Sequence, residues 1–425
     1  MNLIIAPFIA LYASVFLLVV GIGLLGTYLP FRLTVDGIAT QFIGFIMSAY
    51  FFGMCVGALY CYRLIRSVGH IRAFAVFAAT TTSVVVLHGL FISPLFWVVL
   101  RFLSGLSTIG LYTVIESWLN ECTVPTLRGR VMSIYMIVSY LGMVGSQYLL
   151  NLAPIQDTRM FFIISLPLML CIVPVVATRS IHPELPHFDQ FSVRHLLYKA
   201  PVGMLGCFLA GLLNGAFYAI VPVFCHDIGL SVAGLSMVMS TTILGGLVLQ
   251  WPVGALSDRF DRTYMLASLC LAVTLIAILI VFVAEYSFFI FLLTMILFGG
   301  FAFTIYPVSV ARVHDLLEHA DIVPASSVLL LCYCIGATVG PVAASWTMNA
   351  TQTGYGFFVY CAAVSLVTAI IILYLRHKEL ITIVATEDHS TFVLMKGTSP
   401  AAILIDPRIE LDDEVVSDDD LAPTK

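Results

Sequence analysis

Long stretches without a charged residue constrain this chain more than any other feature of its sequence. Ten stretches lack Asp, Glu, Lys and Arg: 1–31, 37–62, 73–100, 131–156, 160–178, 200–226, 228–257, 263–284, 286–311 and 322–375. A helix needs about 20 apolar residues to cross roughly 30 Å of hydrocarbon. The first nine stretches therefore predict one membrane span each. The 54-residue stretch 322–375 predicts two, with the polar segment 349–354 as their turn.

A further span covers about 95–119, which is apolar apart from Arg101 and Glu116, and brings the total to twelve. An even number puts both termini on one side. The loops on the side of the termini carry 16 Lys or Arg residues, and the loops on the other side carry 2. The positive-inside rule therefore predicts cytoplasmic termini.

With 60% hydrophobic and only 10% charged residues, the composition excludes an ordinary water-soluble enzyme. We predict an all-α integral protein of a bacterial inner (plasma) membrane.

The spans divide six and six at the polar segment 179–200. This predicts an N-terminal bundle (1–178), a cytoplasmic linker (179–200) and a C-terminal bundle (201–376). Three positions of the fourth span have counterparts 194 positions later in the tenth. Gly105 and Tyr112 correspond to Gly299 and Tyr306, and the polar residue Asn120 corresponds to His314. The halves are therefore predicted to be a duplication. Parallel repeats of this kind rock about a site at their interface, the geometry of alternating access.

Residues 377–425 form a tail of different character, with four basic and eleven acidic residues. Its acidic runs predict a solvated cytoplasmic segment, for which binding of a cytoplasmic partner is one open role.

The most specific motif follows the eighth span and reads Gly254-Ala-Leu-Ser-Asp258-Arg259-Phe-Asp261-Arg262. It resembles the cytoplasmic loop signature of the major facilitator superfamily. The resemblance implies a gate in which Asp258, Arg259 and Arg262 bond to helix ends or opposite charges when that side closes. The first-half copy has Cys61 at the acidic position and keeps only the basic side of a gate, at Arg63, Arg66 and Arg72.

The fourth span carries a second resemblance to the same superfamily. It opens with Arg101-Phe-Leu-Ser-Gly105 and continues with Glu116-Ser-Trp-Leu-Asn120 and Arg128-Gly-Arg130. These motifs, together with the tail phrase Thr398-Ser-Pro400, resemble the YcaD-like branch in particular. The resemblance implies the fold of that superfamily, two six-helix bundles in a pseudo-twofold arrangement.

Arg101 and Glu116 are charged residues inside a span and are therefore candidates for gating or coupling. They are fifteen residues apart, about 22 Å along a helix, so they cannot pair with each other. Two roles stay open for Glu116. It is an ionised gate partner of Arg63, Arg66 or Arg72, or it carries protons.

In the superfamily that the chain resembles, helices 1, 4, 7 and 10 line the cavity. The resemblance and the polar residues of supporting helices give eight cavity candidates: Tyr28, Tyr112, Gln147, Asn214, Tyr218, Gln250, Tyr306 and Tyr333. Hydrogen bonding between helices is the alternative role for each. No cluster of Lys or Arg lies in mid-membrane, which argues against a multiply anionic substrate.

The sequence gives no sign of an enzyme. Every Asp lies in a predicted loop or in the tail, and no span carries a nucleophile or zinc-protease motif. No P-loop is present, so the chain itself does not hydrolyse ATP. We predict a proton-coupled secondary transporter for a small solute, with the lipid bilayer as its surroundings and no cofactor, metal or nucleic acid. A passive facilitator and a non-transporting receptor or scaffold are the alternatives.

Overall fold

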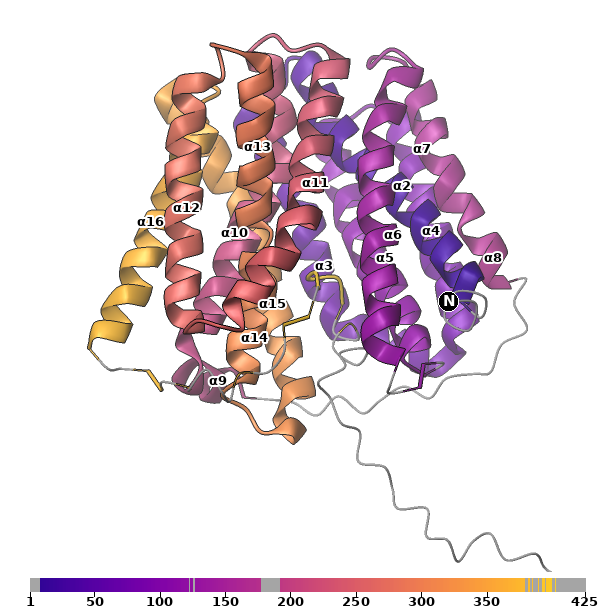
Figure 1. Ribbon diagram of the computed structural model, residues 1–425. Helices are drawn as coiled ribbons and strands as arrows, with labels where there is room; N and C mark the ends of the chain where they lie inside the picture. Colours follow the sequence, from indigo (N-terminus) through magenta and orange to yellow (C-terminus); the bar gives the residue numbers. More distant parts are fainter. Residues whose placement is uncertain are drawn as a thin grey trace, which may run out of the picture.

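The computed structural model describes residues 8–121, 123–124, 127–176 and 192–378, and in the tail residues 381–382, 384, 389, 392–393, 395–399 and 402. This part of the chain is helical and contains no strand. Twelve of its segments are long and apolar enough to cross a membrane, as the charge-free stretches predicted. They stand side by side as two bundles (Figure 1).

The first bundle contains six spans. Its elements are α2 (Ile9–Val35), α3 (Thr40–Val68), α4 (His70–Leu90), α5 (Pro94–Glu121), α6 (Arg128–Tyr148) with the 3₁₀ turn Leu149–Leu152, and α7 (Arg159–Leu170) continued by α8 (Ile172–Val176). The fourth span thus ends close to its predicted end. The predicted linker 179–200 lies mostly outside the described residues, apart from its last part, which contains the short helix α9 (Val193–Lys199).

The second bundle repeats this order. Its elements are α10 (Pro201–Asp227), α11 (Val232–Ser257), α12 (Arg262–Val283), α13 (Phe288–Ala302) with α14 (Ile305–His314), α15 (His319–Thr351) and α16 (Gly356–His377). The predicted break at 349–354 is confirmed, because α15 ends at Thr351 and α16 begins at Gly356. Gln352, in left-handed conformation with φ of 56°, turns the chain between them.

The first span ends later than its charge-free stretch 1–31 predicted. Helix α2 continues through Arg32 to Val35. Arg32 is tolerated there because Asp36 is 2.6 Å from its Nε and its Nη1 donates to the Ile155 carbonyl oxygen at 2.9 Å. A paired charge at the end of a span does not terminate the helix.

The duplication predicted from sequence has a structural counterpart. A Cβ on Gly105 of α5 would lie 1.8 Å from the Tyr50 carbonyl oxygen of α3, and one on Gly299 of α13 would lie 2.0 Å from the Thr242 carbonyl oxygen of α11. Only glycine permits such contact between helix backbones. The equivalent glycines therefore bring equivalent helix pairs together in the two bundles.

The bundles touch each other at one face of the molecule. We call the face where α2 begins and α16 ends the terminal face, and the opposite one the far face (Figure 1). At the far face, the Phe31 and His226 rings lie 5.8 Å apart. The Ser236 hydroxyl donates to the Gln147 carbonyl oxygen at 2.7 Å, and the Asn151 amide lies 3.2 Å from the same hydroxyl. The two bundles are therefore closed together at the far face.

Candidate functional site

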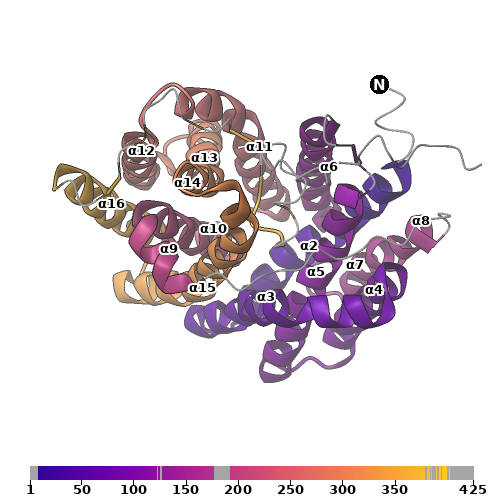
Figure 2. The same ribbon diagram turned by 90° about the horizontal axis from the view of Figure 1, so that it is seen from below.

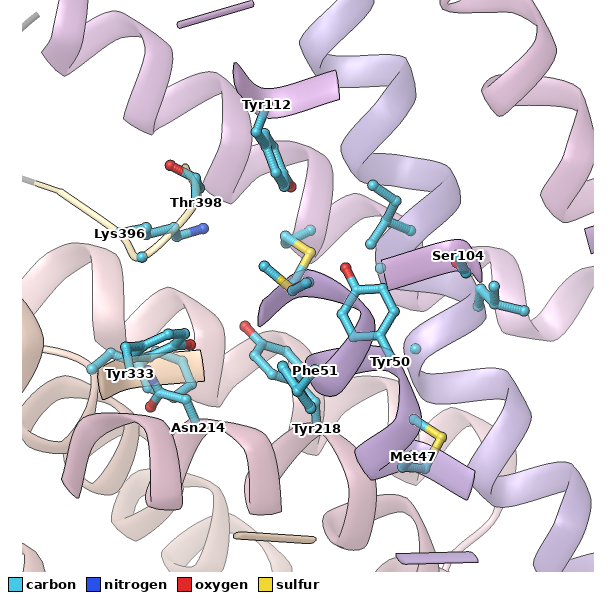
Figure 3. A pocket seen from close by; sticks show the side chains of 18 of the residues that line it. Met47, Tyr50, Phe51, Ser104, Tyr112, Asn214, Tyr218, Tyr333, Lys396 and Thr398 are labelled. Carbon is cyan, nitrogen blue, oxygen red and sulfur yellow. The ribbon is translucent and has the colours of Figure 1, made fainter. Parts of the chain in front are cut away.

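A cavity of about 150 Å³ lies between the two bundles (Figure 3). Helices of both bundles and part of the tail form its wall. Most of the wall is apolar, with glycine, leucine, methionine and phenylalanine from α2, α3 and α6. Its polar groups include Tyr50, Arg101, Ser104, Tyr112, Tyr140, Asn214, Tyr218, Tyr306, Tyr333, Lys396 and Thr398. A cavity with a few polar groups in an apolar wall is the usual form of a small-molecule site.

Five of the eight predicted cavity residues line this space. Asn214 and Tyr218 are one turn apart on α10, and so they face the same way. The Tyr306 and Tyr333 rings are 5.2 Å apart and steeply inclined to each other, which joins α14 to α15. Tyr112 of α5 completes the set on the first bundle. Figure 3 shows Tyr112, Asn214, Tyr218 and Tyr333 around the same space.

The other three predicted cavity residues do not line it. The Tyr28 hydroxyl donates to the Ile155 carbonyl oxygen at 2.9 Å, inside the first bundle. The Gln147 amide bonds to the Met143 carbonyl oxygen and to the Ser146 hydroxyl. Neither residue lines the cavity. Their polar groups instead form hydrogen bonds within the first bundle, which was the alternative considered for each predicted cavity residue.

Gln250 lies just behind the cavity wall and holds the tail. Its amide nitrogen donates to the Met395 carbonyl oxygen at 3.2 Å, and its Oε1 accepts from the Tyr140 hydroxyl at 3.4 Å. Its carboxamide is completely buried. Gln250 thus links the second bundle to the tail and to α6.

The tail enters the space between the bundles, which the sequence did not predict. The Phe392 backbone N–H donates to the Asp258 carboxylate at 3.0 Å. From there the described tail residues pass α11 toward the middle of the molecule (Figure 2). Gly397 lies against the Tyr333 ring, and the Thr398 and Ser399 hydroxyls both donate to Glu116. This segment is docked, whereas the acidic runs on which the expectation of a solvated tail rested lie outside the described residues.

The segment docks because its composition differs from the rest of the tail. Phe392, Val393 and Met395 are apolar, and the small residue Gly397 allows close contact with an aromatic ring. A signal for this was present in the sequence. An apolar phrase ending in Thr398-Ser399 interrupts an otherwise acidic region.

Lys396 brings a cation to the cavity from outside the spans. Its Nζ lies 3.6 Å from the centre of the Tyr140 ring, and Figure 3 shows its amine pointing into the cavity. Burial lowers the pKa of Lys396 to about 7, because desolvation disfavours the charged amine. Neither Lys396 nor the neighbouring Tyr140 was predicted as a site residue.

Arg101 also lines the cavity. The guanidinium stacks on the Tyr50 ring at 4.4 Å, and only 3% of the residue is exposed. Its Nε has no hydrogen-bond partner in the described part of the chain. The stacking with Tyr50 explains how a charge inside the fourth span is accommodated.

Glu116 is completely buried beside the tail. One carboxylate oxygen accepts hydrogen bonds from the Tyr135 hydroxyl at 2.6 Å and from Thr398, and the other accepts one from Ser399. The predicted partners Arg63, Arg66 and Arg72 do not reach it. They are exposed, and Arg63 stacks on Tyr60.

The Asp258 motif forms a network at the terminal face of the second bundle. Arg262 is fully buried and bonds to Asp258 at 2.7 Å and to Asp315 at 2.5 Å. It also donates to the Ala311 carbonyl oxygen at 3.0 Å. Arg259 is exposed and takes no part in these contacts. The network joins α11, α12, α14 and the tail, so these contacts lie within one half of the molecule.

A family model agrees with this architecture. The model of the major facilitator superfamily matches residues 11–231 and 203–404, which include both bundles and the docked part of the tail. The chain belongs to the major facilitator superfamily. Its cavity lies at the interface of the two major facilitator bundles, where a repeat architecture brings its substrate site.

Relatives of this major facilitator protein include transporters of enteric bacteria. The MFS-type transporter YcaD of Escherichia coli strain K12 / DH10B is 28% identical over 373 residues, 86% of this chain and 95% of YcaD. The MFS-type transporter Ent638_1421 of Enterobacter sp. strain 638 is 28% identical over 345 residues, 81% of this chain and 89% of the relative. The predicted resemblance to the YcaD-like branch is confirmed.

Solved major facilitator structures share the fold. The nucleoside transporter NupG, in a mutant form, has a TM-score of 0.73 at 13% identity, covering 86% of this chain and 98% of NupG. A D-xylose-proton symporter has a TM-score of 0.64 at 14% identity, covering 90% of this chain and 99% of the symporter. Two bundles of six spans are therefore the observed fold, as predicted.

Proposed function

We propose that this protein is a secondary transporter that moves a small solute by alternating access and couples the movement to protons. The observation that carries the proposal is the cavity between the two repeats. Contacts between the bundles close it at the far face, and the tail closes it toward the terminal face. Membership of a family of transporters supports the same function.

In this proposal the molecule lies in a bacterial inner membrane with its terminal face in the cytoplasm. The distribution of basic loop residues supports that orientation. The cavity then opens alternately as the far-face contacts separate and the terminal-face contacts form. Asp258 and Arg262 are proposed gate residues, because Arg262 holds the Asp258 carboxylate and that carboxylate accepts a hydrogen bond from the Phe392 backbone N–H of the tail. The tail contacts both bundles, so this hydrogen bond has to change when the bundles rock. Four arginines at the terminal face are exposed: Arg63, Arg66, Arg72 and Arg259. In this proposal they bind partners only in the state in which the far face is open and the terminal face is closed.

Glu116 is the proposed proton-coupling residue. Its carboxyl is buried and bonds only to hydroxyl groups in the described part of the chain. With no cation fixing its charge, this carboxyl can change protonation state as its hydroxyl partners move. The tail supplies two of those partners, so proton exchange is linked to the position of the tail.

The test is transport by purified protein in lipid vesicles that contain a pH-sensitive dye. We expect an added solute to change the internal pH in vesicles that contain protein and not in empty ones. Glu116→Gln should abolish the pH change while solute exchange across the membrane continues. The matched control is Glu285→Gln, at an acid outside the spans that bonds to Tyr355. Unchanged coupling in Glu116→Gln would contradict its assignment, and absence of any solute flux would favour a receptor or scaffold.

A further inference from the structure

The charges that line the cavity are all positive. Among the described residues of its wall, Arg101 and Lys396 are cations and no Asp or Glu is present. Arg101 stacks on Tyr50 and Lys396 lies over Tyr140. Neither forms an ion pair with an acid in the part of the chain that the structure describes. The cavity therefore holds positive charge without a counter-charge from the described part of the protein.

The nearest candidate counter-charge is already occupied. Both oxygens of Glu116 accept hydrogen bonds from hydroxyl groups, and two of the three donors are the tail residues Thr398 and Ser399. Glu116 lies beyond the tail and is not part of the cavity wall. Its contacts hold the tail in position, and they leave the two cations facing the cavity.

Cations in such an environment favour an anion. Moving a charged group out of water is strongly unfavourable unless a partner of opposite charge is supplied. The Tyr50 and Tyr140 rings supply part of this stabilisation through their negative faces. An anionic ligand would supply far more, because its interaction with a cation is little screened in an apolar cavity.

The rest of the wall limits the ligand to a small, largely apolar molecule. The cavity is about 150 Å³, a volume that in other proteins holds a molecule of benzene size. Its remaining wall is mainly tyrosine rings, methionine and aliphatic side chains, which would pack against an apolar or aromatic body.

We propose that the cavity binds a small organic acid with one carboxylate and an apolar or aromatic body, and that Lys396 of the tail is a specificity-determining residue that holds the carboxylate. This rests on the proposed function, and it names the substrate class of the same site. The tail is then part of the solute site as well as its cover. A neutral solute of the same shape would leave Lys396 without a partner of opposite charge.

The experiment measures binding to the purified full-length protein, so its result does not depend on transport. Radiolabelled benzoate and hexanoate are the acid probes, and benzamide and benzylamine are the competitors of similar shape. We expect saturable binding of an acid probe, with benzamide and benzylamine at least tenfold weaker. Lys396→Gln should weaken acid binding at least tenfold, whereas Lys396→Arg should keep it. Lys378→Gln, at an exposed lysine after α16, is the matched control and should have no effect.

Three results would overturn the proposal: no saturable binding of either acid, equal binding of benzamide or benzylamine, or unchanged acid affinity in Lys396→Gln. A faster flux of all solutes in Lys396→Gln, with unchanged selectivity, would also overturn it and leave the tail as a plug alone. Acid binding without flux in vesicles would support the site and contradict only the proposed transport function. Size-exclusion chromatography of each variant checks that it is folded.

Discussion

At the scale of single residues, three positions determine helix packing, the buried carboxylate and the charge of the cavity. Gly105 permits contact between the backbones of α3 and α5. Glu116 is buried with three hydroxyl partners, and Lys396 carries a cation into the cavity. Each of these properties comes from the surroundings of the residue and can be changed by one substitution.

Gly105→Ala is expected to destabilise the protein. The added Cβ would lie 1.8 Å from the Tyr50 carbonyl oxygen, so the two helices have to separate, at a cost of about 1–3 kcal/mol. Thermal unfolding in detergent should show a lower midpoint. Gly145→Ala is the control, because a Cβ there meets nothing within 4 Å. Equal midpoints for the two variants would contradict the tight packing of α3 and α5.

Acid binding is expected to weaken above pH 7. Below pH 7 Lys396 is protonated and offers its charge, and above it the free protein loses that proton, because the pKa of Lys396 is about 7. Affinity should fall about fivefold between pH 7 and pH 8, since the anion binds the protonated form. Apart from Arg101, the titratable residues that share the described cavity wall with Lys396 are tyrosines: Tyr50, Tyr112, Tyr140, Tyr218, Tyr306 and Tyr333. Measurement of Kd at both pH values checks this, and Lys396→Arg should give a flat profile.

At the scale of elements, the docked tail is the least expected feature. It contacts both bundles, through Glu116 and Tyr140 on one side and Gln250, Asp258 and Tyr333 on the other. A segment held on both sides has to loosen when the bundles change their relative position. Its hydrogen bonds to Glu116 are the contacts most easily removed without altering a helix.

Loss of the two tail hydroxyls is expected to release the tail. In Thr398→Val/Ser399→Ala, Glu116 keeps only Tyr135 as a donor, and a buried carboxylate without its donors is destabilised. Lys396 should then react several-fold faster with an amine-labelling reagent, as followed by mass spectrometry. Ser67→Ala/Thr80→Val is the matched control, because those hydroxyls bond only within their own helices. An unchanged labelling rate of Lys396 would contradict the docking.

At the scale of the whole molecule, closure at the far face sets which side of the cavity can open. The contacts there join α2 to α10 and α6 to α11, one pair on each side of the interface. Alternating access requires these contacts to separate during every cycle.

A cross-link at the far face is expected to stop transport and preserve binding. Asn151 and Ser236 lie on different bundles with their polar atoms 3.2 Å apart, so cysteines at both positions can be joined by a short thiol cross-linker. Uptake into vesicles should fall at least tenfold while an acid probe still binds. The single variants Asn151→Cys and Ser236→Cys, treated alike, control for the native cysteines. Full uptake in the cross-linked protein would contradict rocking of the bundles.

Much of the fold follows from local sequence properties. The cost of burying charge and backbone polar groups in hydrocarbon dictates twelve spans, because each apolar stretch has to satisfy its own backbone as a helix. The duplication could be predicted from Gly105 and Gly299. Each allows close contact between two helix backbones in its own half of the molecule. Asn214 and Tyr218 were predictable as cavity residues because the resemblance to the superfamily implies that their helix lines the cavity, and they lie one turn apart on that helix.

Only the tertiary structure decided which polar residues meet. Tyr28 and Gln147 satisfy neighbours within the first bundle and at the far face instead of facing the cavity. Glu116 bonds to Tyr135 and to the tail, more than 280 positions away along the chain. Periodicity specifies the face of one helix, whereas these partners depend on the rotation of each helix and on a segment without periodicity. The sequence thus determined the spans and the repeat, and long-range packing determined the charge of the cavity.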